Sequence, residues 1–248
     1  MARDARHRCT VRVPDWAKTF VAMEADAAEI RNHQAELVPG LLQTEAYARV
    51  VTQAADPTGD PREVEQLVAA RIERQQRLRA ENAPLIWAIL NEAVIRSQVG
   101  DKEITGGQLE HLAALSADPN ITIQVLPFSA GAHPAMGSSF VHLRLADPPD
   151  GEMVSLEDLA NADYLDSPAK MAGHLAVFGS LALTALDPAA TTTLLKNAVW
   201  YAGGPGGDRC PGPRRAGQRR TRRRCRPGTE ASAARPALAG RLRWGSGG

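Results

Sequence analysis

The chain has 248 residues, 44% of them hydrophobic, which is enough for one sizeable domain or two small ones with a packed core. Its formal net charge of +1 conceals a split, because residues 1–202 hold 17 Lys and Arg against 26 Asp and Glu, whereas residues 203–248 hold 12 Arg against two acids. The three cysteines form no disulfide framework or metal-ligand pattern, and no signal peptide or membrane-length apolar run is present, which predicts a cytoplasmic protein without metal, cofactor or membrane contact.

A long amphipathic helix is predicted near the N-terminus. It follows Asp15 and runs for about five turns, because five apolar residues share one face at helical spacing: Trp16, Phe20, Met23, Ala27 and Ile30. Residues 38–44 then interrupt the helix, since Pro39 fixes its own φ and Gly40 permits a positive φ. Thr44 is a suitable N-cap for a short helix that continues through Tyr47.

The next predicted helix carries polar residues on its apolar face. Asp60 is its N-cap, Pro61 takes the first helical position and Glu63 can complete a capping box. Its apolar stripe consists of Val64, Leu67, Val68, Ile72 and Leu78. At ~100° per residue, Arg71 and Gln75 fall in the middle of that stripe, so we expect the guanidinium of Arg71 to be largely desolvated.

Four segments downstream are predicted to be strands. Residues 85–90 are almost wholly apolar, as is typical of a central buried strand. Residues 121–126 and 140–145 alternate between apolar and polar positions, and residues 153–158 return after a predicted turn at 148–151. Helical segments are expected at 91–99, after a capping box at 105–108, and after Ser167 and Asp187. This order predicts an α+β fold in which helices flank a small mixed sheet of about four strands.

We expect an N-terminal arm (1–15), an α+β domain (16–202) and a disordered tail (203–248). The tail contains 12 Arg, 11 Gly and 5 Pro but only two leucines, so it cannot bury enough apolar surface to offset the entropy of ordering. Two interpretations of the tail stay open. Arg-rich disordered segments bind nucleic acid, and the same composition arises when GC-rich DNA is translated out of frame.

Two sequence blocks and several shorter segments carry a resemblance to a known family. The blocks are VPGLLQTEAYA at residues 38–48 and VLPFSAGAH at residues 125–133, and they occur together with Glu24, Arg71 and residues 74–75, 91–96 and 108–109. Over about residues 16–200, the chain resembles the domain of unknown function that follows an XRE-type helix-turn-helix in many antitoxin-like transcriptional regulators of actinobacteria.

The resemblance implies a regulatory module that binds a ligand or a partner and performs no chemistry of its own. It implies a helix-turn-helix regulator, a small toxin-like protein or a small-molecule effector as the partner, and a homodimer is a further expectation. The family usually carries its helix-turn-helix upstream, whereas only fifteen residues precede Trp16 here. We therefore expect the usual DNA reader to be missing and this chain not to bind DNA sequence-specifically.

A buried Arg71 requires a carboxylate partner, because an unpaired buried charge costs several kcal/mol. Glu24 and Glu92 are the plausible partners, and both fall in segments that carry the resemblance. The pair would serve either as a strut that holds the helical part to the sheet or as part of an anion or effector pocket. Both interpretations stay open.

Polar residues around the later strands have structural and functional interpretations. His133 follows Gly131 in a loop, and without a nucleophile motif or phosphate-binding loop it is more typical of a loop anchor than of a catalytic base. If the last two strands pair as a hairpin, four polar residues face the same way: His142, Arg144, Ser155 and Glu157. Such a face is usually solvated, and alternatively it floors a pocket or receives a partner.

Three hypotheses for function follow. The first is a regulatory or interaction module that binds a small ligand or a protein partner. The second is a small-molecule enzyme that uses Glu92, Arg71 and His133 for acid–base chemistry. The third is a truncated product with a folded core and no current function. The candidate structural or binding residues are Glu24, Pro39, Gly40, Gln43, Tyr47, Arg71, Gln75, Glu92, Arg96, Phe128, His133 and Glu157.

Overall fold

The computed structural model describes residues 17–146, 151–157 and 162–203, which all belong to one unit of the chain. The predicted N-terminal arm and the predicted tail from residue 204 onward lie outside the described residues, and so do residues 148–150 of the predicted turn. The described part combines helices with one mixed sheet, so the predicted α+β class is confirmed.

Seven α-helices and three short 3₁₀ helices occur in the described part of the chain. The α-helices are α1 (Lys18–Asp26), α2 (Glu45–Ala55), α3 (Pro61–Gln75), α4 (Glu92–Arg96), α5 (Lys102–Leu115), α6 (Pro168–Thr184) and α7 (Pro188–Gly203). The 3₁₀ helices are η2 (Gly40–Leu42), η3 (Gln76–Arg79) and η4 (Phe128–Ala130).

Six strands form the sheet, in the order β3-β2-β1-β4-β5-β6. They are β1 (Ala27–Gln34), β2 (Leu85–Asn91), β3 (Ile121–Leu126), β4 (Phe140–Leu145), β5 (Glu152–Glu157) and β6 (Ala162–Leu165). The strands β1, β2 and β3 are parallel, whereas β4, β5 and β6 are added as antiparallel neighbours. The four predicted strands correspond to β2, β3, β4 and β5, and the sheet contains β1 and β6 in addition.

The strand β1 replaces the second half of the predicted five-turn helix. The helix α1 ends at Asp26, and Ala27 takes an extended conformation, with φ −68° and ψ 134°, that leads directly into β1. The strand lies in the middle of the sheet and pairs on both sides, so backbone hydrogen bonds determine its conformation. Ile30 is its one large aliphatic side chain, and tertiary pairing therefore overrides the local helical pattern.

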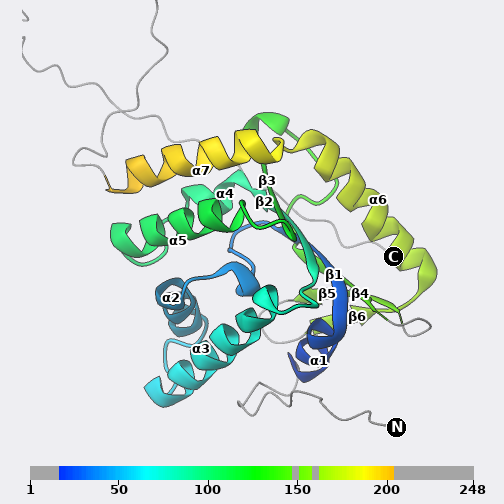
Figure 1. Cartoon of the computed structure of the whole chain (residues 1–248), viewed down its shortest axis with the longest axis horizontal. Helices are drawn as coiled ribbons and strands as arrows, with labels where there is room; N and C mark the ends of the chain where they lie inside the picture. The colour runs from blue at the N-terminus through cyan, green and yellow to red at the C-terminus, as the bar shows by residue number, and fades with distance from the viewer. Residues whose placement is uncertain (1–16, 147–150, 158–161, 204–248) are drawn as a thin grey trace, which may run out of the picture. The chain divides into compact units, whose positions relative to one another are not determined.

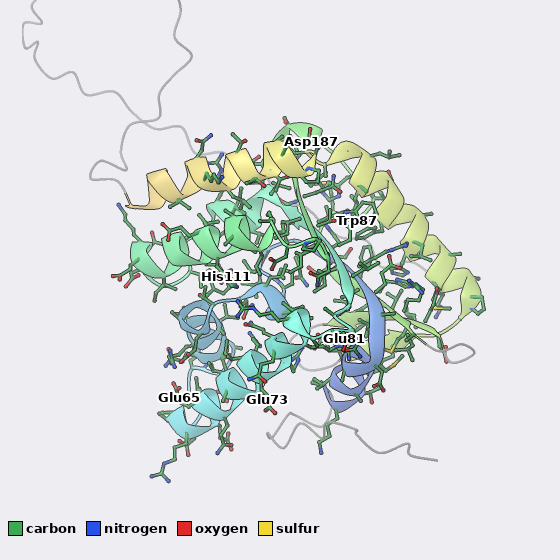
Figure 2. All side chains as sticks on the ribbon, viewed as in Figure 1. Glu65, Glu73, Glu81, Trp87, His111 and Asp187 are labelled. Carbon is green, nitrogen blue, oxygen red and sulfur yellow. The ribbon has the colours of Figure 1, made fainter. Side chains whose placement is uncertain are left out.

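Helices cover both faces of the sheet (Figure 1). On one face, α1, α5 and α7 contribute to a core that includes Ile30 and Leu143. On the other face, α6 covers a second core through Phe178, which packs near Phe140. Trp87 lies between the sheet and α6 (Figure 2), with its ring 5.3 Å from that of Phe178. The helices α2 and α3 pack against each other.

Two of the predicted N-caps are confirmed, and one is wrong. The side chains of Thr44 and Asp60 each accept a backbone hydrogen bond from the first turn of the helix that follows. The helix α5 begins directly after Asp101, which caps it, so Thr105 lies inside the helix rather than at its start. The Thr105 hydroxyl donates to the carbonyl oxygen of Val99 at 3.0 Å and holds the preceding loop.

The predicted hairpin of β4 and β5 is confirmed, but its register differs from the one expected. Val141 lies opposite Ser155, and His142 lies opposite Val154. Because paired residues share a face of the sheet, Ser155 and His142 point to opposite faces. Their exposed fractions are 1% and 2%, so the expected solvated polar face does not form. Glu157 is the last residue of β5.

The helices α6 and α7 begin at the prolines that follow Ser167 and Asp187, as predicted. Within the part of the chain that the structure describes, no single helix is long and apolar enough to cross a membrane. The helices α6 and α7, which are bent by 71° relative to each other, reach the length and apolar composition of a membrane span only when they are taken together.

Candidate functional site

The carboxyl ends of the three parallel strands lie at one edge of the sheet. These ends are Gln34, Asn91 and Leu126. The strand β4 is antiparallel to β1, and its first residue, Phe140, pairs with His33, so the loop before β4 reaches the same edge. In open sheets of this kind, ligands bind outside the carboxyl ends of the strands. We call three segments the carboxyl edge: residues 35–38, 91–96 and 127–139.

Hydrogen bonds join the loops of the carboxyl edge to one another. The backbone N–H of Phe128 donates to the Glu92 carboxylate at 2.8 Å and connects η4 to α4. The other oxygen of Glu92 pairs with Arg96, one helical turn later, at 3.0 Å. The N–H of Ala35 donates to the Ser139 hydroxyl at 3.0 Å and connects the loop after β1 to the loop before β4. The edge is therefore a preorganised surface.

Three large apolar side chains of the carboxyl edge are exposed. The exposed fractions are 41% for Leu37, 61% for Phe128 and 66% for Met136. Leu37 follows β1 and Phe128 follows β3, two strands away, so about 10 Å separates these two strand ends. The other exposed large hydrophobic residues among those described, Leu85 and Leu183, lie at the start of β2 and on α6. Exposed apolar groups that gather in one area mark interaction sites.

Two histidines pack together at this end of β1. His33 is fully buried, and its ring centroid lies 6.1 Å from that of His133. The Nδ1 of His33 lies 3.2 Å from the carbonyl oxygen of Ile89, so Nδ1 donates and Nε2 is left as an acceptor. The Nε2 of His33 and the Nδ1 of His133 are buried and have no hydrogen-bond partner among the described residues. Burial lowers the pKa of His33, and the neighbouring His133 lowers it as well.

The three residues considered for an enzyme belong to separate clusters. Glu92 accepts hydrogen bonds from Arg96 and from a backbone N–H of η4. Arg71 donates from Nη1 to the side-chain oxygen of Gln43 at 2.5 Å. His133 packs on the ring of His33. Each therefore serves a different part of the fold.

Candidate residues of the block 38–48 hold one turn of the chain. The Gln43 amide nitrogen donates to the carbonyl oxygen of Val38 at 2.6 Å, while its oxygen accepts from Arg71. The Gln75 amide nitrogen donates to the carbonyl oxygens of Gly40 at 3.0 Å and Gln43 at 2.7 Å. The polar positions in the apolar stripe of α3 thus bind the turn, which is an architectural role.

Further hydrogen bonds complete this turn. The carbonyl oxygen of Pro39 accepts from the N–H of Leu42 at 2.8 Å, and the buried Tyr47 hydroxyl accepts a backbone N–H of the same turn at 3.3 Å. Gln108 of α5, with an exposed fraction of 1%, donates to the carbonyl oxygen of Leu42 at 2.8 Å and accepts from Thr44 N–H at 2.7 Å. The turn is therefore held from both α3 and α5.

Gly40 does not adopt the positive φ that a glycine permits. Among the described glycines, positive φ values occur at Gly100, Gly131 and Gly137, whereas Gly40 begins η2. A Cβ atom built on Gly40 would lie 3.8 Å from Cδ and Nε of Arg71, which is an ordinary contact. Gly131 follows η4 with φ 69°, a conformation that favours glycine, and it turns the chain toward His133.

Glu24 and Glu92 pair with arginines other than Arg71. Arg74 holds Glu24 in a bidentate ion pair, with Nε–Oε1 and Nη2–Oε2 distances of 2.7 and 2.8 Å. Glu92 pairs with Arg96. A strut between α3 and α1 therefore exists, and Arg74 forms it with Glu24.

A charged cluster lies on the face of the sheet that carries His142. Glu29 accepts from the Nε atoms of Arg31 at 2.7 Å and Arg144 at 2.9 Å. Burial alone would raise the pKa of Glu29, but these hydrogen bonds outweigh it and lower the pKa. Burial lowers the pKa of His142, and Glu152, 3.4 Å from Nε2, offsets only part of that effect. These charges pair with one another, as in a structural network.

The sequence patterns did not identify three residues: Leu37 and Met136 of the carboxyl edge, and His33 at the end of β1 next to it. His33 lies in β1, beyond the apolar residues that defined the predicted helix. Leu37 and Met136 lie in loops, where periodicity carries no information about exposure. The block 125–133 was the usable signal, because it contains both Phe128 and His133.

The carboxyl edge has the composition of a surface for noncovalent binding. Its three exposed apolar side chains share the edge with the ion pair of Glu92 and Arg96, which is joined to the backbone of Phe128. In residues 17–146, 151–157 and 162–203, no three His, Cys, Asp or Glu side chains are arranged to hold a metal ion.

Comparison with known proteins identifies the family. A family described as "Domain of unknown function (DUF5753)" matches residues 17–197. Neither the search of curated proteins nor the search of solved structures found a match. Because the matched segment covers most of the chain and contains every described strand, this chain belongs to the DUF5753 family of domains of unknown function.

Proposed function

We propose that this chain is a regulatory interaction module that binds a protein partner through the carboxyl edge. The observation that carries the proposal is the exposure of Leu37, Phe128 and Met136 on two loops that lie at one edge of the sheet. Methionine and aromatic side chains are enriched at the centres of protein interfaces. A few such anchors supply most of the binding energy when surrounding groups exclude water from them.

The charge of the described residues favours a protein partner over nucleic acid. They contain 13 Lys and Arg against 21 Asp and Glu, a net charge of −8. The carboxyl edge carries two acids, Glu36 and Glu92, and one arginine, Arg96. Nucleic-acid-binding surfaces are strongly positive, so we propose that this part of the chain does not recognise a DNA sequence.

The proposed partner is a helix-turn-helix regulator or a small toxin-like protein encoded beside this chain in an actinobacterial genome. The similarity of residues 38–48 and 125–133 to the antitoxin-like XRE-family regulators supports this class of partner. The complex would form in the cytoplasm, and the partner would supply the contact with DNA or the toxic activity.

Co-expression tests the proposal directly. The chain is produced together with each protein encoded beside it, and complexes are isolated through a tag on this chain. We expect one neighbour to co-purify, and isothermal titration calorimetry then gives its Kd. Failure of every neighbouring protein to bind would contradict the proposed class of partner.

Two surface variants locate the interface. The double variant Phe128→Ser, Met136→Ser should weaken the complex by about 30-fold or more, which corresponds to a loss of about 2 kcal/mol at interface anchors. The control is Leu183→Ser, which replaces an exposed large apolar side chain outside the carboxyl edge. Leu183 lies on α6 and is 91% exposed. Both variants should keep the thermal midpoint of the wild type. Equal Kd values for the two variants would overturn the proposal.

A further inference from the structure

A depression lies at the amino end of β1, opposite the carboxyl edge. Its volume is about 520 Å³, which is within the range of sites for small molecules. It is lined by the polar residues Arg77, Asp26 and Asn82, by alanines that include Ala83, and by Leu145. The loop between η3 and β2 borders it, and Glu81 marks this loop in Figure 2.

The guanidinium of Arg77 is incompletely satisfied. Its Nη2 donates to the carbonyl oxygen of Ala27 at 2.7 Å, but its Nε is buried without a hydrogen-bond partner among the described residues. A guanidinium has five N–H donors, so most of the donors of Arg77 lack a protein acceptor there. A partly buried cation with an unpaired buried donor favours a nearby anion, and the adjoining depression provides space for one.

Five other described arginines pair with carboxylates of the same chain. Arg31, Arg74 and Arg96 bind Glu29, Glu24 and Glu92. Within the described residues, Arg77 forms no such ion pair, although Asp26 lines the same depression. Arg77 and Asp26 therefore present opposite charges to one space without neutralising each other.

We propose that this depression binds a small zwitterion, an amino acid or a short peptide, with its carboxylate on Arg77 and its ammonium on Asp26. A simple anion would meet the repulsion of the exposed Asp26, whereas a zwitterion complements both charges. The alanine side chains and Leu145 contact small apolar substituents, and the Asn82 amide offers a hydrogen bond to either end of the ligand.

This site is separate from the proposed partner surface. The strand β1 has eight residues, so its ends, near Ala27 and Gln34, lie about 25 Å apart. Loss of ligand binding at the depression therefore leaves the Phe128 surface intact, and the two proposals fail independently.

Nuclear magnetic resonance titration of the full chain tests the site. The zwitterionic probes are L-alanine and L-alanyl-L-alanine, which place their two charges at different separations. Propionate supplies the carboxylate alone, and alaninamide supplies the ammonium alone. We expect saturable shifts at Ala27, Ala28 and Ala83, with at least one zwitterion binding tenfold or more tightly than either single-charge probe. Absence of saturable shifts with all probes at about 10 mM would overturn the proposal.

Three variants assign the charges. Arg77→Gln should weaken binding of the zwitterion and of propionate tenfold or more. Asp26→Asn changes an exposed side chain, so the fold is retained, and it should weaken binding of the zwitterion alone. Arg79→Gln, an exposed arginine of the same 3₁₀ helix, is the matched control and should leave every Kd unchanged. Equal affinity of the wild type for propionate and the zwitterions, or no effect of Asp26→Asn, would overturn the assignment of a zwitterion.

Discussion

Arg74 and Glu24 connect α3 to α1 through two parallel hydrogen bonds of 2.7 and 2.8 Å. Their side chains are 20% and 7% exposed, and the guanidinium lies 6.0 Å from the ring centroid of Phe20. Removing one partner leaves the other charge largely buried. We therefore expect Arg74→Ala to lower the free energy of unfolding by about 3 kcal/mol, measured by urea denaturation.

Two comparisons isolate the ion pair from other effects of the substitution. Arg62→Ala removes an exposed arginine from the same helix and should change the free energy of unfolding by less than about 0.5 kcal/mol. Replacing both Arg74 and Glu24 by methionine should recover much of the loss, because no unpaired charge remains. If Arg74→Ala costs no more than Arg62→Ala, the strut does not stabilise the fold.

Gln108 tests the role of the turn at residues 38–44. Its amide makes hydrogen bonds to the backbone of Leu42 and Thr44 and is almost fully buried. Gln108→Ala leaves two backbone groups without partners, so the free energy of unfolding should fall by about 2 kcal/mol or more. Gln98→Ala is the matched control, because Gln98 is exposed and its amide donates to the carbonyl oxygen of Gly100 in its own loop. Thermal and urea unfolding that fail to separate the two variants would contradict the architectural role of Gln108.

Much of the fold could be predicted from local signals, and β1 could not. The strands β2 to β5 have apolar runs or strict alternation, and Thr44 and Asp60 are strong caps. In β1, the residues from Ala27 to Ile30 continue the spacing of a helix, and pairing with β2 and β4 decides the conformation. A register shift of one residue reverses the faces of a strand, so the side chains of β5 were also beyond local patterns.

The candidate site was predictable in part for similar reasons. The stripe of α3 placed Arg71 correctly against the turn, through Gln43. It could not show that Arg74, three residues later, reaches Glu24, because that depends on where α1 packs. Phe128 came from a sequence block, whereas the placement of the loop of Met136 at this edge depends on the topology of β4.

Buried histidines make the stability depend on pH. Burial is the main cause that lowers the pKa of His33, His111 and His142 below the usual 6.5. In the unfolded chain these rings regain the ordinary pKa and bind protons more strongly than in the folded chain. Stability is therefore fully present above about pH 6.5 and declines as the pH falls below it. We expect urea denaturation to give a lower free energy of unfolding at about pH 5.5 than at about pH 7.5.

The variant His33→Gln separates this effect from general acid sensitivity. It removes the fully buried imidazole beside His133, so the difference in unfolding free energy between the two pH values should be smaller than in the wild type. An unchanged difference would show that His33 does not contribute to the pH dependence.

Hydrogen–deuterium exchange of the chain, alone and in complex with the neighbouring protein that co-purifies, tests the partner surface most directly. Amides of the carboxyl edge lie in loops, and their exchange should slow when Leu37, Phe128 and Met136 are covered. We expect new protection in residues 35–38 and 127–139, and none on the outer face of α6 around Leu183. Protection confined to α6 or to α3, with unchanged exchange at the carboxyl edge, would contradict the proposed function.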